Sequence, residues 1–151
     1  MNEIKFRGQR ADNKQWVYGY YFKTPLTDEA TNSKPEDGWF FLSGRERYCI
    51  AQNNCVYEVI PETVGQFTGI DEIYNGDILT ADSYPFKDDD KPNYNAEVYW
   101  DNGALQFCIC LHCVNPNKQG ISDGMCEALT ERGIKFTKIG NIYDNPELLE
   151  R

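Results

Sequence analysis

The sequence contains a single histidine, few methionines, and no apolar stretch that approaches the length of a membrane-spanning segment. The longest apolar runs, such as residues 107–111, are far below the roughly 18 residues that a membrane helix needs. The first ten residues are charged and contain neither an apolar core nor a small-residue cleavage site. We therefore expect a protein without an export signal or membrane contact, located in the cytoplasm.

The shortage of histidine also restricts catalysis. A Ser-His-Asp or Cys-His mechanism would have to use His112, because no other imidazole can take the proton. Gly65 and Gly69 lack the lysine and the spacing of a phosphate-binding loop. The acidic run at residues 88–90 lacks the alternating spacing of a calcium loop and its final glutamate. No catalytic residue and no cofactor are predicted, and we favour a role that is not enzymatic.

The cysteines offer the sharpest chemical candidate. The six are Cys49, Cys55, Cys108, Cys110, Cys113 and Cys126. Without an export signal, an even number of cysteines does not indicate disulfides, and we interpret them as buried thiols. The alternative is zinc bound by Cys108, Cys110, His112 and Cys113, because the gap between Cys110 and Cys113 is typical of a zinc knuckle.

The zinc hypothesis has two weaknesses. A complete second pair of ligands would have to include Cys126 or the distant Cys49 and Cys55. On a strand, Cys108 and Cys110 share one face while Cys113 takes the other. Buried strand cysteines therefore remain the favoured interpretation.

The net charge is -9 and is unevenly distributed. Residues 1–25 carry five basic and two acidic side chains, whereas the acids dominate residues 26–129. A duplex-binding protein needs a concentrated basic face, so nucleic acid is not the expected partner. One alternative is a nucleic-acid-binding regulator that uses a small SH3-like β-barrel together with the basic residues Lys5, Arg7 and Arg10 of the first strand. Another alternative is an acidic protein that mimics nucleic acid.

The aromatic content predicts a mainly β fold, α+β at most, in one domain. Ten Tyr, eight Phe and three Trp supply large apolar area and prefer strands. Residues 4–8 and 16–22 read as an opening hairpin, followed by a loop over residues 24–38 and strands at residues 39–42 and 55–60. We divide the chain into N-terminal hairpins and loop (residues 1–60) and a part similar to a small SH3-like barrel (residues 61–151).

The part of the chain over residues 61–151 contains residue types that are typical of turns. Asn75-Gly76 predicts a turn that leads into a strand. A polar loop is expected over residues 84–95, and a hairpin over residues 97–111 that turns at residues 101–103. We expect one or two short helices: residues 125–132, capped by Ser122 or Asp123 and closed by Gly133, and one turn after Asn145. A last strand is predicted over residues 134–139.

An aromatic cluster in the opening hairpin is the predicted interaction surface, and it comprises Trp16, Tyr18, Tyr20 and Tyr21. Trp16, Tyr18 and Tyr20 should share one strand face, with Val17 and Tyr21 on the other. One of the two faces belongs to the core, and the other is either covered by the following loop or exposed as a Tyr-rich partner surface. We expect a protein partner, a second copy of the chain included.

Three segments in order resemble the YopX family of phage and prophage proteins. They are residues 4–7 with 17–20, residues 62–69 leading into 72–78, and residues 139–149. The connection between Gly69 and Glu72 is shorter than in many relatives, and the segment from Cys108 to Cys113 is not a family hallmark. The resemblance implies a phage or prophage accessory protein in a bacterial host cell and implies no particular activity.

Overall fold

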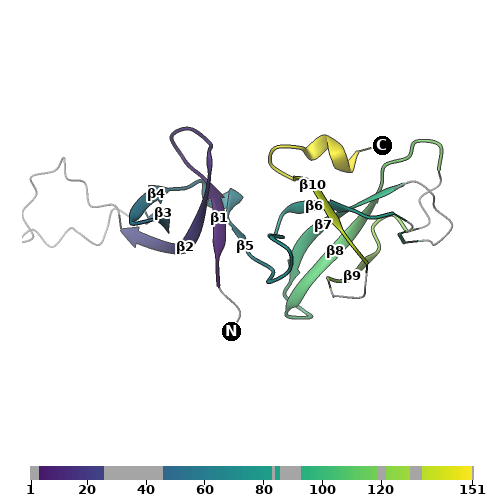
Figure 1. Cartoon of the computed structure of the whole chain (residues 1–151), viewed down its shortest axis with the longest axis horizontal. Coiled ribbons are helices and arrows are strands. Elements are labelled where there is room, and N and C mark those ends of the chain that lie inside the picture. The colour runs from purple at the N-terminus through teal and green to yellow at the C-terminus, as the bar shows by residue number, and fades with distance from the viewer. Residues whose placement is uncertain are drawn as a thin grey trace, which may run out of the picture. The chain divides into compact units, whose positions relative to one another are not determined.

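In the computed structural model the protein is built almost entirely from antiparallel strands, which confirms the mainly β prediction. The structure describes residues 4–25, 46–82, 84–85, 93–118, 122–129 and 134–150. The chain divides into two compact units, Met1–Gln66 and Phe67–Arg151. Each contains one five-stranded sheet, coloured purple to teal in the first unit and teal to yellow in the second (Figure 1).

The first sheet has the order β4-β3-β2-β1-β5. Its strands are β1 (Phe6–Gln9), β2 (Trp16–Pro25), β3 (Glu46–Gln52), β4 (Cys55–Glu58) and β5 (Gly65–Gln66). The opening hairpin is confirmed, since Phe6 pairs with Gly19 and Gln9 with Trp16. The short β5 adds to the other side of β1, where Gln66 pairs with Phe6. The predicted strand at residues 39–42 and nearly all of the predicted loop at 24–38 lie outside the described residues.

Gly19 marks the place where β2 changes partners. Up to Gly19, β2 pairs with β1, and from Tyr20 onward it pairs with β3. A Cβ atom at Gly19 would lie 1.9 Å from the carbonyl oxygen of Ala51. Because that oxygen belongs to the neighbouring backbone, the two strands can approach this closely only at a glycine.

The first sheet also curls back on itself. Ile60 N donates to Gln9 O at 2.8 Å and Ala11 N donates to Glu58 O at 3.0 Å, so the chain leaving β4 returns to the end of β1. The 3₁₀ turn η3 (Pro61–Thr63) follows directly. The concave side buries Val17, Ile50 and Val59 as the core of this unit.

The second sheet has the order β10-β6-β7-β8-β9. Its strands are β6 (Asp77–Thr80), β7 (Tyr94–Asp101), β8 (Gln106–Cys113), β9 (Cys126–Ala128) and β10 (Thr137–Asn141), and the 3₁₀ turn η4 (Pro146–Leu149) follows. Core residues on one side include Leu79, Val98, Ile109 and Leu111. Within the described ranges β9 and β10 are the edges, so this sheet is open and hydrogen bonds do not close the predicted barrel.

The predicted turn at Asn75-Gly76 is confirmed, and a buried carboxylate stabilises it. Gly76 has φ 85° and leads into β6. The fully buried carboxylate of Asp77 accepts a hydrogen bond from Tyr74 N at 2.8 Å and pairs with Lys138 Nζ of β10 at 3.4 Å. Asp77 therefore ties the turn to the edge strand of the sheet, which is a structural role.

Three element predictions are wrong in detail. The helix expected over residues 125–132 is instead strand β9 over Cys126–Ala128, because pairing with the edge of β8 outweighs weak local helix preference. Asp123, expected as a helix cap, accepts a hydrogen bond from Cys113 N at 3.0 Å. The predicted polar loop at residues 84–95 begins and ends in the core with the buried Tyr84 and Tyr94, and the last strand begins only at Thr137.

Other local predictions hold. The hairpin of β7 and β8 turns where expected, with Asp101 Oδ1 accepting hydrogen bonds from Gly103 N and Ala104 N. The tail forms the expected single turn at η4. Among the described residues no helix is long and apolar enough to span a bilayer.

Candidate functional site

The convex side of the first sheet carries what we call the aromatic face. It consists of Trp16, Tyr18, Tyr20 and Phe22 of β2, Ala51 of β3 and Val56 of β4. Ile4, just before β1, lines the same hollow as Tyr20. The predicted alternation along β2 agrees with the burial pattern: Val17 is buried, while Tyr20 is 69 % exposed. Tyr21, the fourth residue of the predicted surface, packs on the core side against Phe6 at 5.5 Å between ring centroids.

Three of these residues form a row across adjacent strands. Tyr20 is paired with Ala51, and Ala51 is paired with Val56, so the three side chains stand side by side on one face. Val56 is 62 % exposed and Ile4, nearby, is 64 % exposed. Contiguous exposed apolar side chains of this kind mark interaction surfaces more often than scattered ones do.

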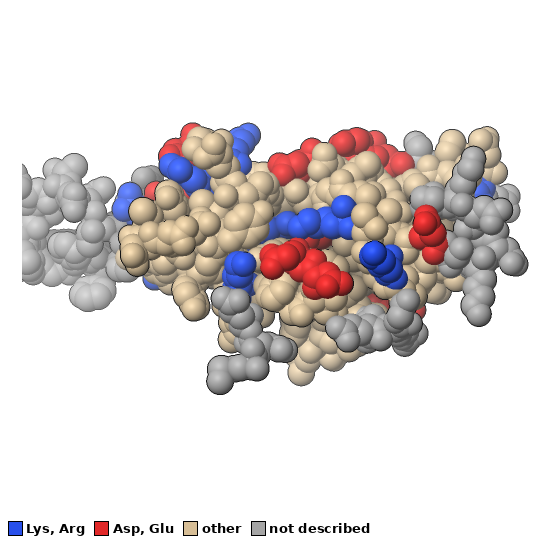
Figure 2. All heavy atoms as spheres, viewed as in Figure 1, with Lys and Arg blue, Asp and Glu red and all other residues tan. Residues whose placement is uncertain are grey.

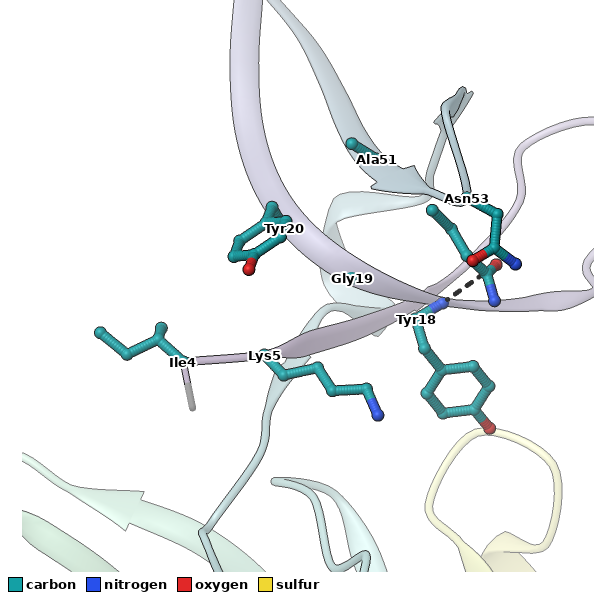
Figure 3. Close-up of a pocket in the computed structure, with 8 residues that line it drawn as sticks. Ile4, Lys5, Tyr18, Gly19, Tyr20, Ala51 and Asn53 are labelled. Carbon is teal, nitrogen blue, oxygen red and sulfur yellow. Dashed lines mark hydrogen bonds between the residues drawn. The ribbon is translucent and has the colours of Figure 1, made fainter. Parts of the chain in front are cut away.

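A shallow hollow of about 290 Å³ lies beside Tyr20. Ile4, Lys5, Tyr18, Gly19 and Ala51 line it, together with the turn residues Gln52 and Asn53 (Figure 3). Gly19 contributes only backbone atoms to the lining. Tyr18 N donates a long hydrogen bond of 3.4 Å to Gln52 Oε1, the dashed line in Figure 3. The hollow thus combines an aromatic wall with amide and ammonium groups at its rim.

The basic residues proposed for nucleic-acid contact are largely engaged within the unit. Arg7 is only 2 % exposed and its guanidinium stacks on the ring of Trp16 at 4.7 Å. Arg10 forms an ion pair and hydrogen bonds with Asp12. Lys5 lies 6.0 Å from the ring centroid of Tyr18. These contacts do not build the concentrated basic face that a duplex requires.

Charge is divided unequally between the two units. Counted from the sequence, Met1–Gln66 has eight basic and nine acidic residues, a net of -1, and Phe67–Arg151 has seven and fifteen, a net of -8. On the side drawn in Figure 2, most red carboxylates accordingly lie over the second unit. The aromatic face therefore belongs to the nearly neutral part of the chain.

The second sheet carries a different cluster on the side opposite its main core, which we call the thiol face. Its members are Glu97 and Tyr99 of β7, Cys108, Cys110 and His112 of β8, and Cys126 of β9. Glu97 stands opposite Cys110, and Cys110 stands opposite Cys126. His112 Nε2 lies 3.5 Å from Glu97 Oε2.

The two thiols that β8 contributes to the thiol face, Cys108 and Cys110, have raised pKa values. Burial, together with the adjacent Cys126, raises the pKa of Cys110 to about 11. Burial also raises the pKa of Cys108. The hydrogen bond that links Tyr99 to Cys126, and then burial, raise the pKa of Tyr99. Since the thiolate is the reactive form of cysteine, Cys108 and Cys110 react slowly with reagents from solvent at neutral pH.

The four zinc candidates do not converge. Cys108, Cys110 and His112 lie on the thiol face, whereas Cys113 points into the core with Ile109 and Leu111, as the predicted alternation requires. In the part of the chain that the structure describes, no three His, Cys, Asp or Glu side chains are arranged to hold a metal ion. The carboxylate of Glu97 is the neighbour that the structure gives His112 on this face.

Sequence reasoning missed two parts of these surfaces. Val56 and Ala51 join the aromatic face only through the β2-β3-β4 register, and β3 itself was not predicted. Cys126 joins the thiol face only because residues 126–128 form an edge strand rather than a helix. The Asn53-Asn54 turn, with φ of 49° and 63°, was the one local signal that could have located β3 by counting back from the turn.

Comparison with known proteins adds one finding. No curated protein matches the chain. The family model described as YopX protein matches residues 5–150, which is nearly the whole chain. The matched range includes both sheets, the Asn75-Gly76 turn and the tail. The chain therefore belongs to the YopX family.

Proposed function

We propose that this YopX-family chain is a non-catalytic accessory protein of phage or prophage type that acts by associating with a second copy of itself through the aromatic face. The phage or prophage setting rests on the family resemblance. The raised pKa of Cys110, which keeps this thiol protonated, favours binding over catalysis.

The observation that carries the proposal is the row of Tyr20, Ala51 and Val56. Two of its three side chains are more than half exposed, and they stand side by side across three strands. Tyr offers large apolar area and a polar tip at low entropic cost, which is why it is enriched at interfaces. The hollow beside Tyr20 can accept an aromatic side chain from a partner.

The charge distribution permits a second copy of the chain as the occupant of the aromatic face. A two-fold axis near Ala51 would bring the small side chain of each copy to the centre and set Tyr20 of each copy against the other face. The first unit has a net charge of only -1, so two such units approach with little repulsion, whereas two second units at -8 each repel one another. Association through the first unit is therefore the electrostatically favoured mode.

Light scattering after gel filtration tests the proposal. We expect a mass near twice 17.4 kDa at high concentration, with dissociation on dilution. Tyr20→Ser should weaken the dimer about 100-fold, because each copy loses about 1.5 kcal/mol and a symmetric dimer contains two copies of Tyr20. Because the contact is apolar, about 0.5 M salt should not dissociate it.

Leu105 provides the matched control. It is 73 % exposed on the turn between β7 and β8 and is not part of the aromatic face, so Leu105→Ser should leave the mass unchanged. A wild-type protein that stays at 17.4 kDa up to about 200 µM would overturn self-association. An equal loss of dimer in the Tyr20 and Leu105 variants would overturn the aromatic face as the contact.

A further inference from the structure

The register of β8 and β9 places two thiols directly opposite each other. Cys110 is the pairing partner of Cys126. Leu111 N donates to Met125 O at 2.9 Å, one position beyond this pair, so Cys110 and Cys126 occupy a non-hydrogen-bonded position of the ladder. Cα atoms at such positions lie about 4.5 Å apart, which falls within the roughly 4.4–6.8 Å range of disulfides.

The same register disfavours a disulfide that involves either of the other two thiols of this sheet, Cys108 and Cys113. Cys108 stands opposite Ala128, so Cys126 is its diagonal neighbour. Diagonal Cα atoms lie about 7–8 Å apart, beyond the usual reach of a disulfide. Cys113 points into the core, on the other side of the sheet. The geometry therefore selects one pair among the four thiols.

The two selected sulfurs differ in access. Cys126 is exposed and Cys110 is half-buried. Tyr99 contacts Cys126 through a hydrogen bond, and the Cys126 thiol itself donates to Gly124 O at 3.5 Å. Burial and the contact with Cys126 raise the pKa of Cys110 to about 11, so Cys110 holds its proton at neutral pH. An oxidant arriving from solvent therefore meets Cys126 first.

We propose that Cys110 and Cys126 are a redox site that closes to a reversible cross-strand disulfide when the protein meets a two-electron thiol oxidant of the peroxide class. The Cys126 thiolate attacks a peroxide oxygen, the O–O bond breaks, hydroxide leaves, and Cys126 becomes a sulfenic acid. Cys110 then attacks that sulfur, its proton and the sulfenic hydroxyl leave as water, and the S–S bond forms. Two thiols lose two electrons in total, and one hydrogen peroxide becomes two water molecules.

The disulfide acts on the edge of the sheet. β9 spans only Cys126–Ala128 and pairs with β8 alone in the described structure. In the reduced protein a few backbone hydrogen bonds hold this strand, so it belongs to the elements that open most easily. The covalent link pins β9 to the centre of the second unit, and reduction by a dithiol releases it. The site is independent of the aromatic face proposed for association.

Peptide mapping without reduction tests the site. The reduced full-length protein is treated with hydrogen peroxide, remaining thiols are blocked with N-ethylmaleimide, and the digest is analysed by mass spectrometry. We expect a linked peptide pair that contains Cys110 and Cys126, a protein mass lower by two hydrogen atoms, and a fall from six free thiols to four. Dithiothreitol should restore all six. Amide exchange over residues 122–129 should slow at least about tenfold in the oxidised protein.

Cys55 supplies the matched control. It is an exposed thiol on β4, opposite Gln52 and without a cysteine partner, so Cys55→Ser should leave the linked peptide and the exchange change intact. Cys110→Ser and Cys126→Ser should each abolish the linked peptide and the change in amide exchange. A link from Cys126 to Cys108, a disulfide between two chains through Cys126, or over-oxidation of Cys126 without any link would overturn the proposal. Six thiols still free after peroxide treatment would do the same.

Discussion

Replacing Gly19 by alanine should unfold much of the first unit. The new Cβ would lie 1.9 Å from the carbonyl oxygen of Ala51, and real Cβ atoms essentially never approach another atom closer than 3.0 Å. The backbones of β2 and β3 must therefore separate by at least about 1.1 Å at this point. Because the obstructing atom is backbone, no side-chain rotation can relieve the contact.

The cost follows from two contributions. Overpacking costs about 1–3 kcal/mol even where side chains can shift. The displaced strands also stretch ladder hydrogen bonds near the Tyr20–Ala51 pair, at about 1 kcal/mol each. With about two such hydrogen bonds stretched, the two contributions together give about 3–5 kcal/mol. At about 0.05–0.15 kcal/mol per residue, a unit of this size is stable by only about 3–10 kcal/mol, so most of its free energy of unfolding is lost.

Thermal unfolding combined with amide hydrogen exchange measures the effect. At about 4 °C or more per kcal/mol, the unfolding temperature of the first unit should fall by at least about 12 °C. Exchange should accelerate in β2 and β3 and not in β7 and β8. Gly103→Ala is the control, because its nearest contact is the movable carboxylate of Asp101 at 3.2 Å. A Gly19→Ala protein that melts within about 2 °C of the wild type would refute the close approach of β2 and β3.

Two further predictions concern the second unit. Gly76 and Gly124 both have positive φ, of 85° and 76°. A Cβ atom at Gly76 would also lie 3.1 Å from the ring of Tyr143, whereas a Cβ atom at Gly124 would meet no atom within 4 Å. Urea unfolding should therefore show that Gly124→Ala lowers the free energy of unfolding by about 1–2 kcal/mol and that Gly76→Ala lowers it clearly more. Equal losses would exclude the Tyr143 contact. The raised pKa of Cys110, about 11 against an ordinary 9.0, leaves about 1 % of this thiol as thiolate at pH 9 instead of half. Iodoacetamide should accordingly alkylate Cys110 in the native protein at pH 9 about 50-fold more slowly than in urea, and equal rates would contradict the buried thiol.

Local chemistry was enough to predict some elements. The Asn75-Gly76 turn and the hairpin at residues 101–103 depend on short-range signals that hold wherever the segment folds. The alternation of aromatic residues along β2 likewise assigned Tyr20 to one face and Tyr21 to the other. These predictions succeed because strand periodicity is a property of the backbone.

The remaining features depend on partners that lie far apart in the sequence. Residues 126–128 have no strong strand preference and become β9 only because the edge of β8 is available. Val56 reaches the aromatic face through the register with Ala51, and Cys126 reaches Cys110 in the same way. Pairing of this kind is set by the whole sheet, so single-sequence patterns could suggest the candidate residues but not their neighbours.

The placement of β5 has a practical consequence for dissecting the protein. Gly65 and Gln66 extend the first sheet, yet they lie in the same family motif whose later residues form the turn that starts β6. A fragment cut after Ile60 would lack β5 and also Thr63, whose Oγ1 accepts a hydrogen bond from Gln9 N at 2.9 Å. β1 would then be left as an unprotected edge prone to aggregation. A fragment meant to contain the first unit should therefore extend to Gln66, and substitutions in this one segment should be examined for damage to both halves of the chain.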